Sequence, residues 1–221
     1  MSRPADVIVI ATGNRGKVAE FAHAFGELGI GVRSLIDYPG LEPAEETGDT
    51  FAANALLKAQ AVARALGVPA LADDSGLCVD ALGGAPGVYS ARYAGEGAGD
   101  SANNAKLLAT LAEGTQSHEE AAAYAAAGGY ALPDGVRALS RARFVCALAL
   151  YDPASGKVTA VEGAAPGVIL DRPLGDGGFG YDPLFWVPQL GCTMAQLTKP
   201  QKQAISHRGA ALGRLLPLLR D

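Results

Sequence analysis

Two adjacent carboxylates and a hydroxyl, those of Asp73, Asp74 and Ser75, stand at the end of an apolar run. Carboxylates that face a cleft serve as proton acceptors or as ligands of hard cations. Apolar runs of this length are typical of buried strands, in which adjacent residues point to opposite faces. Only one of the two aspartates can therefore face a given cleft, and the other must be hydrogen-bonded or solvated. On this stretch alone a simple turn is the favoured alternative, because Asp, Ser and Gly are good turn formers.

A lysine on the apolar face of a predicted helix is the second unusual feature. The pattern predicts a helix from about residue 50 to residue 66, closed by Gly67, with an apolar face made of Phe51, Ala55, Val62 and Leu66. Lys58 falls in the middle of this face, and Asn54 lies beside it one turn earlier. An unpaired buried ammonium is very costly, so Lys58 either extends to water or pairs with an anion. Because Lys58 is in mid-helix, we favour an anion, either a carboxylate such as that of Asp74 or a phosphate.

The start of the chain combines a strand, a glycine-rich loop and a helix. Residues 7–11 are apolar and mostly β-branched, residues 12–17 read TGNRGK, and apolar residues then recur at helical spacing. In such an arrangement backbone N–H groups, the helix N-terminus and Lys17 favour an anion. The loop is not a Walker motif, which needs Gly in place of Ala11 and Ser or Thr in place of Val18. A plain left-handed turn at the glycines is an equal alternative to a phosphate site.

Two later stretches could contact a ligand. Phe179 stands between glycines, so its ring is available to lie against something flat, although a hydrophobic plug in a loop is an equal alternative. The final segment begins with four cationic or titratable groups, Lys199, Lys202, His207 and Arg208. These indicate a second anion contact, or otherwise only a solvated helix start.

The composition restricts the class of protein. With 221 residues, 49% of them apolar, and 29 glycines, the chain predicts one compact α/β domain over residues 1–221. A net charge of −5 without a basic run argues against a nucleic-acid polymer as partner. No apolar run of ~18 residues and no signal-peptide pattern occurs, so we expect no membrane association and a cytoplasmic location. The three cysteines lack metal-type spacing and are expected to be buried thiols.

The remaining elements predict a mixed sheet. Residues 143–151 and 158–162 flank a hairpin loop, and such a pair complements the parallel-type strand at the start of the chain. We expect a helix over residues 101–112 with Asp100 as its N-cap, and a C-terminal helix whose last turn is distorted by Pro217. Residues 114–141, rich in Ala and Gly, predict a surface insertion.

Seven ordered motifs together resemble one family. The strings are ATGNRGK, AEETGDTF, NALLKA, ADDSGL, LGGAPGVYSARYAG, GGFGYDPLF and ISHRGAAL, which extend from Ala11 to Leu212. They are similar to those of the pyrophosphatases that hydrolyse inosine and xanthosine triphosphates and their deoxy forms. The resemblance implies an α/β fold with an elongated mixed β-sheet flanked by helices, in which two lobes enclose a cleft. It also implies a homodimer.

The resemblance assigns roles to individual residues. For the triphosphate it implies Thr12, Gly13, Asn14, Arg15, Gly16 and Lys17. For Mg²⁺ it implies Glu45 and Asp74, with Asp74 also as the proton acceptor and Lys58 beside the phosphates. For other substrate contacts it implies Ser75, and for the base and sugar Phe179, Gly180, Tyr181, Asp182, Lys202, His207 and Arg208.

The implied reaction is attack of water between the α and β phosphates of a nucleoside triphosphate, which gives a monophosphate and pyrophosphate. Phosphoryl transfer asks a protein mainly for positioning and charge neutralisation, which Mg²⁺, Lys17, Lys58 and Lys202 could supply. Two alternatives stay open. One is a related nucleotide pyrophosphatase with another base preference, and the other is a nucleotide sensor without turnover.

Overall fold

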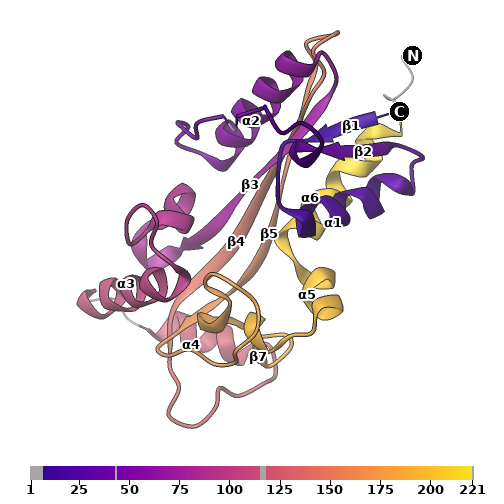
Figure 1. Cartoon of the computed structure of the whole chain (residues 1–221). Helices are drawn as coiled ribbons and strands as arrows, with labels where there is room; N and C mark the ends of the chain where they lie inside the picture. Colours follow the sequence, from indigo (N-terminus) through magenta and orange to yellow (C-terminus); the bar gives the residue numbers. More distant parts are fainter. Residues whose placement is uncertain (1–6, 43, 115–117, 221) are drawn as a thin grey trace. The chain divides into compact units, whose positions relative to one another are not determined.

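The computed structural model describes residues 7–42, 44–114 and 118–220. These residues form two compact units (Figure 1). Unit 1 contains the described residues up to Ser75, Cys146–Gly163 and those from Arg208 onward, and unit 2 contains the described residues of 76–145 together with Ala164–His207. No described helix is long and apolar enough to cross a membrane.

Seven strands form one mixed sheet. They are β1 (Val7–Ile10), β2 (Gly31–Ser34), β3 (Ala70–Val79), β4 (Ala138–Tyr151), β5 (Val158–Leu170), β6 (Phe185–Val187) and β7 (Cys192–Thr193). Their order is β2-β1-β3-β4-β5-β6-β7, in which β1 is parallel to β2 and β3, whereas β6 is antiparallel to β5 and β7. The predicted mixed sheet is confirmed.

Six α-helices flank the strands. They are α1 (Arg15–Gly26), α2 (Phe51–Leu66), α3 (Asp100–Glu113), α4 (Glu119–Ala126), α5 (Lys199–Ile205) and α6 (His207–Leu215) among the described residues. The predicted bounds of α2 are confirmed at both ends. Thr50 caps its N-terminus by accepting from the Ala53 amide, and Gly67 closes it with a φ of 68°, a value that favours glycine.

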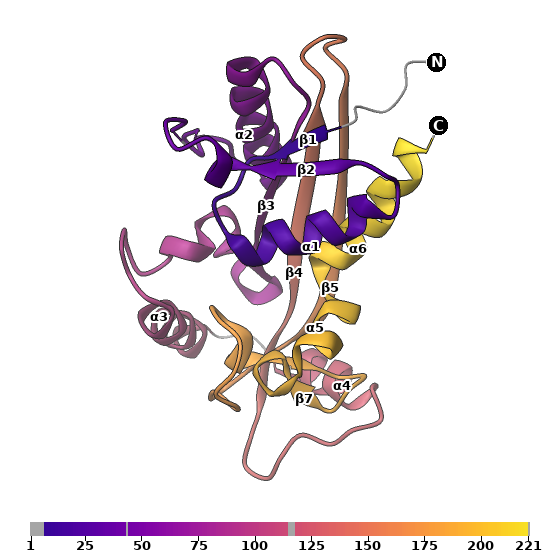
Figure 2. The same cartoon turned by 45° about the vertical axis from the view of Figure 1, so that its right-hand side comes forward.

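In unit 1 helices cover both faces of the strands. Ile8 and Ile10 of β1 pack in one cluster with Phe21 and Phe25 of α1 and Leu212 of α6. Figures 1 and 2 show α1 and α6 side by side. The residue between the two isoleucines, Val9, packs instead with Val62 and Ala63 of α2. This alternation follows from the two-residue period of a strand, and it places α2 on the face opposite α1 and α6.

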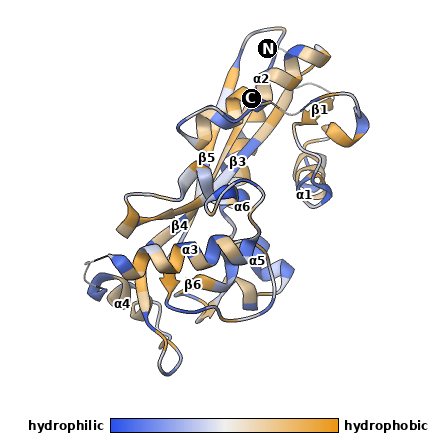
Figure 3. Cartoon of the chain, turned by 60° about the vertical axis from the view of Figure 1, so that its left-hand side comes forward, coloured by the Kyte–Doolittle hydropathy of each residue, from blue (hydrophilic) through white to orange (hydrophobic). Residues whose placement is uncertain are grey.

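In unit 2 the same alternation places α3 and α4 on opposite faces of β5. Ile169 clusters with Leu107 and Leu111 of α3, whereas its neighbours Val168 and Leu170 cluster with Ala121 and Ala125 of α4. Helix α4 belongs to residues 114–141, so this stretch contributes side chains to the core. Figure 3 shows the hydrophobic colour along the strands.

The buried strand predicted before Asp73 and Asp74 is confirmed, and the turn alternative is wrong, because β3 runs unbroken from Ala70 to Val79. Two local predictions need correction. Asp100 is the first residue of α3, and Gly99 takes the N-cap position. The predicted C-terminal helix is two helices that break at Ser206, followed by a 3₁₀ turn at Leu216–Leu219 that contains Pro217, as expected for a proline there.

Candidate active site

The two aspartates of β3 face opposite sides of the sheet. Leu71 packs in the cluster that holds α1 and α6, so Asp73, two residues later, points to the same side. Ala70 packs against α2, and Asp74 shares its direction. The side-chain contacts agree, because Asp73 pairs with residues of α1 and α6 while Asp74 pairs with residues of α2. The prediction that the two aspartates cannot face the same cleft is therefore confirmed.

Asp73 lies at the centre of a buried ion-pair network. Its Oδ2 lies 2.8 Å from Lys17 Nζ, 3.2 Å from Arg208 Nη2 and 3.5 Å from the Ser75 hydroxyl. The Arg208 Nη1 donates to Glu20 at 3.2 Å. Burial alone would raise the pKa of Asp73, but the two cations outweigh it and hold the pKa below its usual value. Asp73 is therefore a fixed anion that anchors Lys17 and Arg208.

Asp74 belongs to a second cluster on the α2 side. Its Oδ1 accepts from Lys58 Nζ at 3.0 Å, and its Oδ2 accepts from Asn54 Nδ2 at 3.3 Å. The same Lys58 Nζ lies 2.8 Å from Glu46 Oε1. The expectation that Lys58 pairs with an anion is confirmed, with Asp74 as one partner and Glu46 as the other.

The cluster formed by Glu46, Lys58 and Asp74 contains two carboxylates and one ammonium. Burial raises the pKa of Asp74, and the Lys58 ammonium, which also serves Glu46, does not compensate for it. Burial lowers the pKa of Lys58, but its two carboxylate partners outweigh this and raise it. Burial thus dominates at Asp74, whereas at Lys58 the two carboxylates together outweigh burial. A site of this kind suits a further cation with oxygen ligands, such as a divalent metal ion.

Of the two predicted metal ligands, Glu45 and Asp74, only Asp74 belongs to the cluster formed with Glu46 and Lys58. Glu45 is exposed, and it is Glu46 whose carboxylate reaches Lys58. Among the described residues no three Asp, Glu, His or Cys side chains are arranged as a metal centre. The loop of residues 44–48, which carries Glu45 and Glu46, is called the acidic loop below. Its carboxylates and that of Asp74 have the donor chemistry that a hard cation needs, and the assignment of Glu45 stays a prediction.

The loop before α1 is an N-terminal cap. Asn14 Oδ1 accepts from the backbone amides of Gly16 and Lys17 at 2.9 and 3.1 Å, and Thr12 Oγ1 accepts from the Asn14 amide. Neither Gly13 nor Gly16 has a positive φ, so the left-handed-turn alternative is wrong. A Cβ at Gly13 would meet no described atom within 4 Å, which leaves its backbone open to a ligand.

The second candidate region is the glycine-rich loop of unit 2. The ring of Phe179 is 70% exposed, which excludes the plug alternative, and the Lys202 ammonium lies 4.3 Å from its centroid. Lys202 also pairs with Asp182, whose carboxylate accepts from the Phe179 amide at 2.8 Å. The loop thus presents one aromatic face together with one cation.

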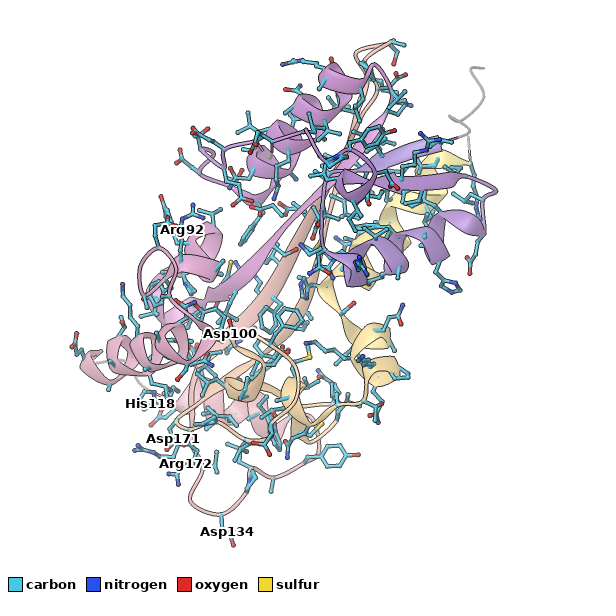
Figure 4. The ribbon with its side chains drawn as sticks, in the orientation of Figure 1. Arg92, Asp100, His118, Asp134, Asp171 and Arg172 are labelled. Carbon is cyan, nitrogen blue, oxygen red and sulfur yellow. The ribbon has the colours of Figure 1, made fainter. Side chains whose placement is uncertain are left out.

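Helix α3 holds this loop from its first two turns. Asp100, labelled in Figure 4, accepts from the Gly180 amide at 2.6 Å through Oδ2, and Asn104 donates to the Gly180 carbonyl at 3.0 Å. The carboxylate that the sequence assigns to capping therefore fixes the Phe179 loop instead. Gly180 has a φ of 60°, a value that few side chains tolerate.

Two predicted base-binding residues are held by structural contacts. Tyr181 is buried, and its hydroxyl donates to the Ser90 carbonyl at 2.9 Å. Burial raises the pKa of this hydroxyl, so it stays protonated. The ring of His207 stacks on Phe144 with centroids 5.3 Å apart. The side chain of Tyr181 is therefore part of the core, and only its main chain is placed to serve a ligand.

A cavity of about 500 Å³ in unit 2 is unrelated to these residues. Apolar residues near the end of α3, with His118, Arg137, Leu139 and Asp171, line it. Figure 4 labels His118 and Asp171. Asp171 is already paired with both Arg137 and Arg172. Because none of the residues predicted for chemistry lines this cavity, the charged cluster of unit 1 is the better candidate.

The charge balance of the cluster changes what is expected of Lys58→Met. A lysine paired only with a bound anion could be replaced by Met with lost activity and little lost stability, but in the structure this change removes the cation that buried Asp74 shares with the partly exposed Glu46. We expect the free energy of unfolding at pH 7 to fall by about 2 kcal/mol, less than for a fully buried pair because Glu46 is partly exposed. Urea denaturation measures it, and the double variant Lys58→Met/Asp74→Asn should recover most of the loss. Wild-type stability in the single variant would contradict the charge argument.

Comparisons with known proteins agree in pointing to one family. The model of the Ham1 family matches residues 8–140 and 133–218. A dITP/XTP pyrophosphatase of Geobacillus kaustophilus is 50% identical over 210 residues, which are 94% of this chain and 91% of that one. A dITP/XTP pyrophosphatase of Shigella flexneri is 48% identical over 97% of this chain and 98% of its own. The solved structure of a HAM1 protein from Coxiella burnetii, 37% identical, aligns with a TM-score of 0.83 over 97% of this chain and 98% of its own.

Proposed function

Since this chain belongs to the Ham1 family, we propose that it is a nucleoside triphosphate pyrophosphatase that hydrolyses ITP, dITP and XTP to the monophosphate and pyrophosphate. Removing these deaminated purines from the nucleotide pool keeps them out of DNA and RNA. The observation that carries the proposal is the cluster of Glu46, Lys58 and Asp74, in which a buried carboxylate of raised pKa lies beside a cation. Near full-length similarity to named pyrophosphatases favours an enzyme over a nucleotide sensor.

Asp74 is the proposed proton acceptor and a metal ligand. Burial raises the pKa of Asp74, which makes it a better base than an ordinary aspartate. Asp74 and Glu45 would hold Mg²⁺, which when bound neutralises phosphate charge and lowers the pKa of nearby water. Lys58, fixed against Asp74, supplies positive charge for the developing charge on the phosphates. Asp74 can then take a proton from the water that attacks between the α and β phosphates.

The triphosphate is proposed to bind the N-terminal end of α1, through Thr12, Gly13, Asn14, Arg15, Gly16 and Lys17. Asn14 already occupies the amides of Gly16 and Lys17, so in this loop we assign to the phosphates chiefly the open backbone at Gly13 and the charge of the Lys17 ammonium. The Lys17 side chain is 31% exposed, and its pairing with Asp73 holds it at this end of the helix.

The base is proposed to stack on the exposed ring of Phe179, with Gly180, Tyr181, Asp182, Lys202, His207, Arg208 and Ser75 as further substrate contacts. Hypoxanthine and xanthine present an acceptor at position 6 and a donor at N1, whereas adenine presents the reverse. A pocket built for the first pattern leaves two polar groups unpaired against adenine. Each unpaired buried group costs about 1–3 kcal/mol, so ATP should be disfavoured by about 10² to 10⁴ in kcat/KM.

A nucleotide panel tests this function. We expect kcat/KM with Mg²⁺ to be highest for ITP and XTP, poor for GTP and lowest for ATP, with pyrophosphate and not orthophosphate as product. A chelator should abolish turnover and Mn²⁺ should restore it, because the carboxylates otherwise repel a triphosphate. Turnover of ATP equal to that of ITP, or orthophosphate as the first product, would refute the proposal.

Variants in the base region refine the same experiment. Phe179→Ala should weaken all purines alike, whereas His207→Ala should narrow the ratio of ITP to ATP. Arg208 is a poor probe of base recognition, because its guanidinium also pairs with Asp73 and Glu20. A homodimer and a cytoplasmic location belong to the same proposal, and analytical ultracentrifugation measures the first of these.

A further inference from the structure

Asn54 is a fully buried polar residue between two parts of unit 1. It lies in α2 one turn before Lys58 and has an exposed fraction of 0%. Its Oδ1 accepts from the Gly48 amide at 2.7 Å, and its Nδ2 donates to Asp74 Oδ2 at 3.3 Å. A buried amide needs partners for both ends, and here one end serves the acidic loop and the other serves the carboxylate of β3.

The two ends of the amide have separable consequences. An acceptor alone would satisfy Gly48, so the fold of the loop does not require the Nδ2 donor. That donor takes Asp74 Oδ2 while Lys58 takes Oδ1. A carboxylate held at both oxygens cannot rotate about its Cβ–Cγ bond without losing a hydrogen bond. The amide also stabilises the ionised carboxylate without adding charge.

The acidic loop packs tightly against the side-chain amide of Asn54. A Cβ added at Gly48 would lie 2.8 Å from Asn54 Oδ1 and 2.8 Å from Ala53 Cβ, too close for any side chain. Only glycine therefore lets the loop that carries Glu45 and Glu46 approach α2 at this point. Asn54 joins that loop to Asp74 through two hydrogen bonds on one side chain.

We propose that Asn54 is a positioning residue that fixes the direction of the Asp74 carboxylate and joins the acidic loop to it, so that the carboxylates are assembled before a cation and substrate bind. The inference rests on the proposed function for its meaning in catalysis. Its geometric part concerns the Asp74 carboxylate and the acidic loop, and the effect on Asp74 is testable in the metal-free protein.

Asn54→Asp tests the donor while keeping the acceptor for Gly48. We expect the pKa of Asp74, followed by ¹³C NMR of its carboxyl in the metal-free protein, to rise by at least about one unit, because a donor is lost and a carboxylate is added. With ITP, the acid limb of the kcat profile should move to higher pH by a similar amount, and kcat should fall about 10- to 100-fold. Asn54→Ala, which removes the donor without adding charge, should raise the same pKa by less.

Thr50→Ala is the matched control. Thr50 caps the same helix by accepting a hydrogen bond from the Ala53 amide, so Thr50→Ala lowers stability. It leaves both hydrogen bonds of the Asn54 side chain in place. This variant should leave the Asp74 titration and the acid limb unchanged. An Asp74 pKa unmoved in both Asn54 variants, or moved equally by Thr50→Ala, overturns the positioning role. If the NMR shift occurs but no nucleotide is hydrolysed by the wild type, the positioning stands and the proposed function fails.

Discussion

Asp74→Asn should abolish turnover and leave the protein as stable as the wild type or more stable at pH 7. The asparagine can neither accept a proton nor neutralise a cation, so kcat for ITP should fall at least about 10³-fold. Burial raises the pKa of Asp74, so its favourable contribution to folding is present at low pH and lost as the pH rises through that value. Removing the charge therefore relieves a penalty at neutral pH, and Lys58 keeps Glu46 as a partner.

Steady-state kinetics and urea denaturation of the same preparation separate the two effects. Asp80→Asn is a suitable control, because Asp80 follows directly after β3 and forms a half-exposed pair with Arg143. It should change neither activity nor stability appreciably. An Asp74→Asn variant within tenfold of wild-type kcat would remove Asp74 from the proposed chemistry, and one that unfolds at neutral pH would contradict the stability argument.

Asp73→Asn, one residue earlier, should lower the stability of the protein at pH 7, which Asp74→Asn does not. It leaves Lys17 and Arg208 beside a neutral amide, and breaking a buried pair in this way costs about 3 kcal/mol, the lower end of the usual range because Lys17 can reach water. The two cations hold the pKa of Asp73 below its usual value. Its contribution to stability is therefore present above the usual aspartate pKa of about 4 and lost as the pH falls through the lower folded value.

The measurement is the difference in unfolding free energy between wild type and Asp73→Asn as a function of pH. The difference should be constant from pH 7 to about pH 5 and should shrink below about pH 4. A variant that keeps wild-type stability at pH 7 would show that Lys17 and Arg208 are solvated and that Asp73 is not an anchor. Loss of activity alone would not distinguish the two aspartates, so the pH dependence of stability is the deciding observation.

Much of this organisation follows from residue spacing alone. The two-residue period of a strand predicts that Asp73 and Asp74 diverge, and the helical period predicts that Lys58 is buried against an anion. Both are local rules acting on neighbouring residues. Thr50 and Gly67 mark the ends of α2 for the same reason, since capping depends on a few adjacent backbone groups.

Local spacing rules do not predict which residues meet when the chain folds. The sequence places Asn54 beside Lys58, but its bonds to Gly48 and Asp74 depend on how the loop closes. The acidic loop offers several glutamates, and nothing local distinguishes Glu46 as the partner of Lys58. Asp100 is a good N-cap by type, yet a tertiary contact with Gly180 uses its carboxylate. In the last case a contact between residues distant in sequence overrides a local preference.

The continuity of β3 limits how the chain can vary in length. Because Asp73 and Asp74 sit in the interior of one strand, insertion or deletion of a single residue ahead of them would rotate both by half a turn. The anion that anchors Lys17 and Arg208 would then face α2, and the one beside Lys58 would face α1. A substitution elsewhere in this strand changes only the packing around one side chain. A change of length would move both Asp73 and Asp74 away from their present partners. Length variation in relatives of this chain should therefore gather in its loops, such as Asp152–Lys157 at the hairpin between β4 and β5, and avoid the strand that separates the two carboxylates.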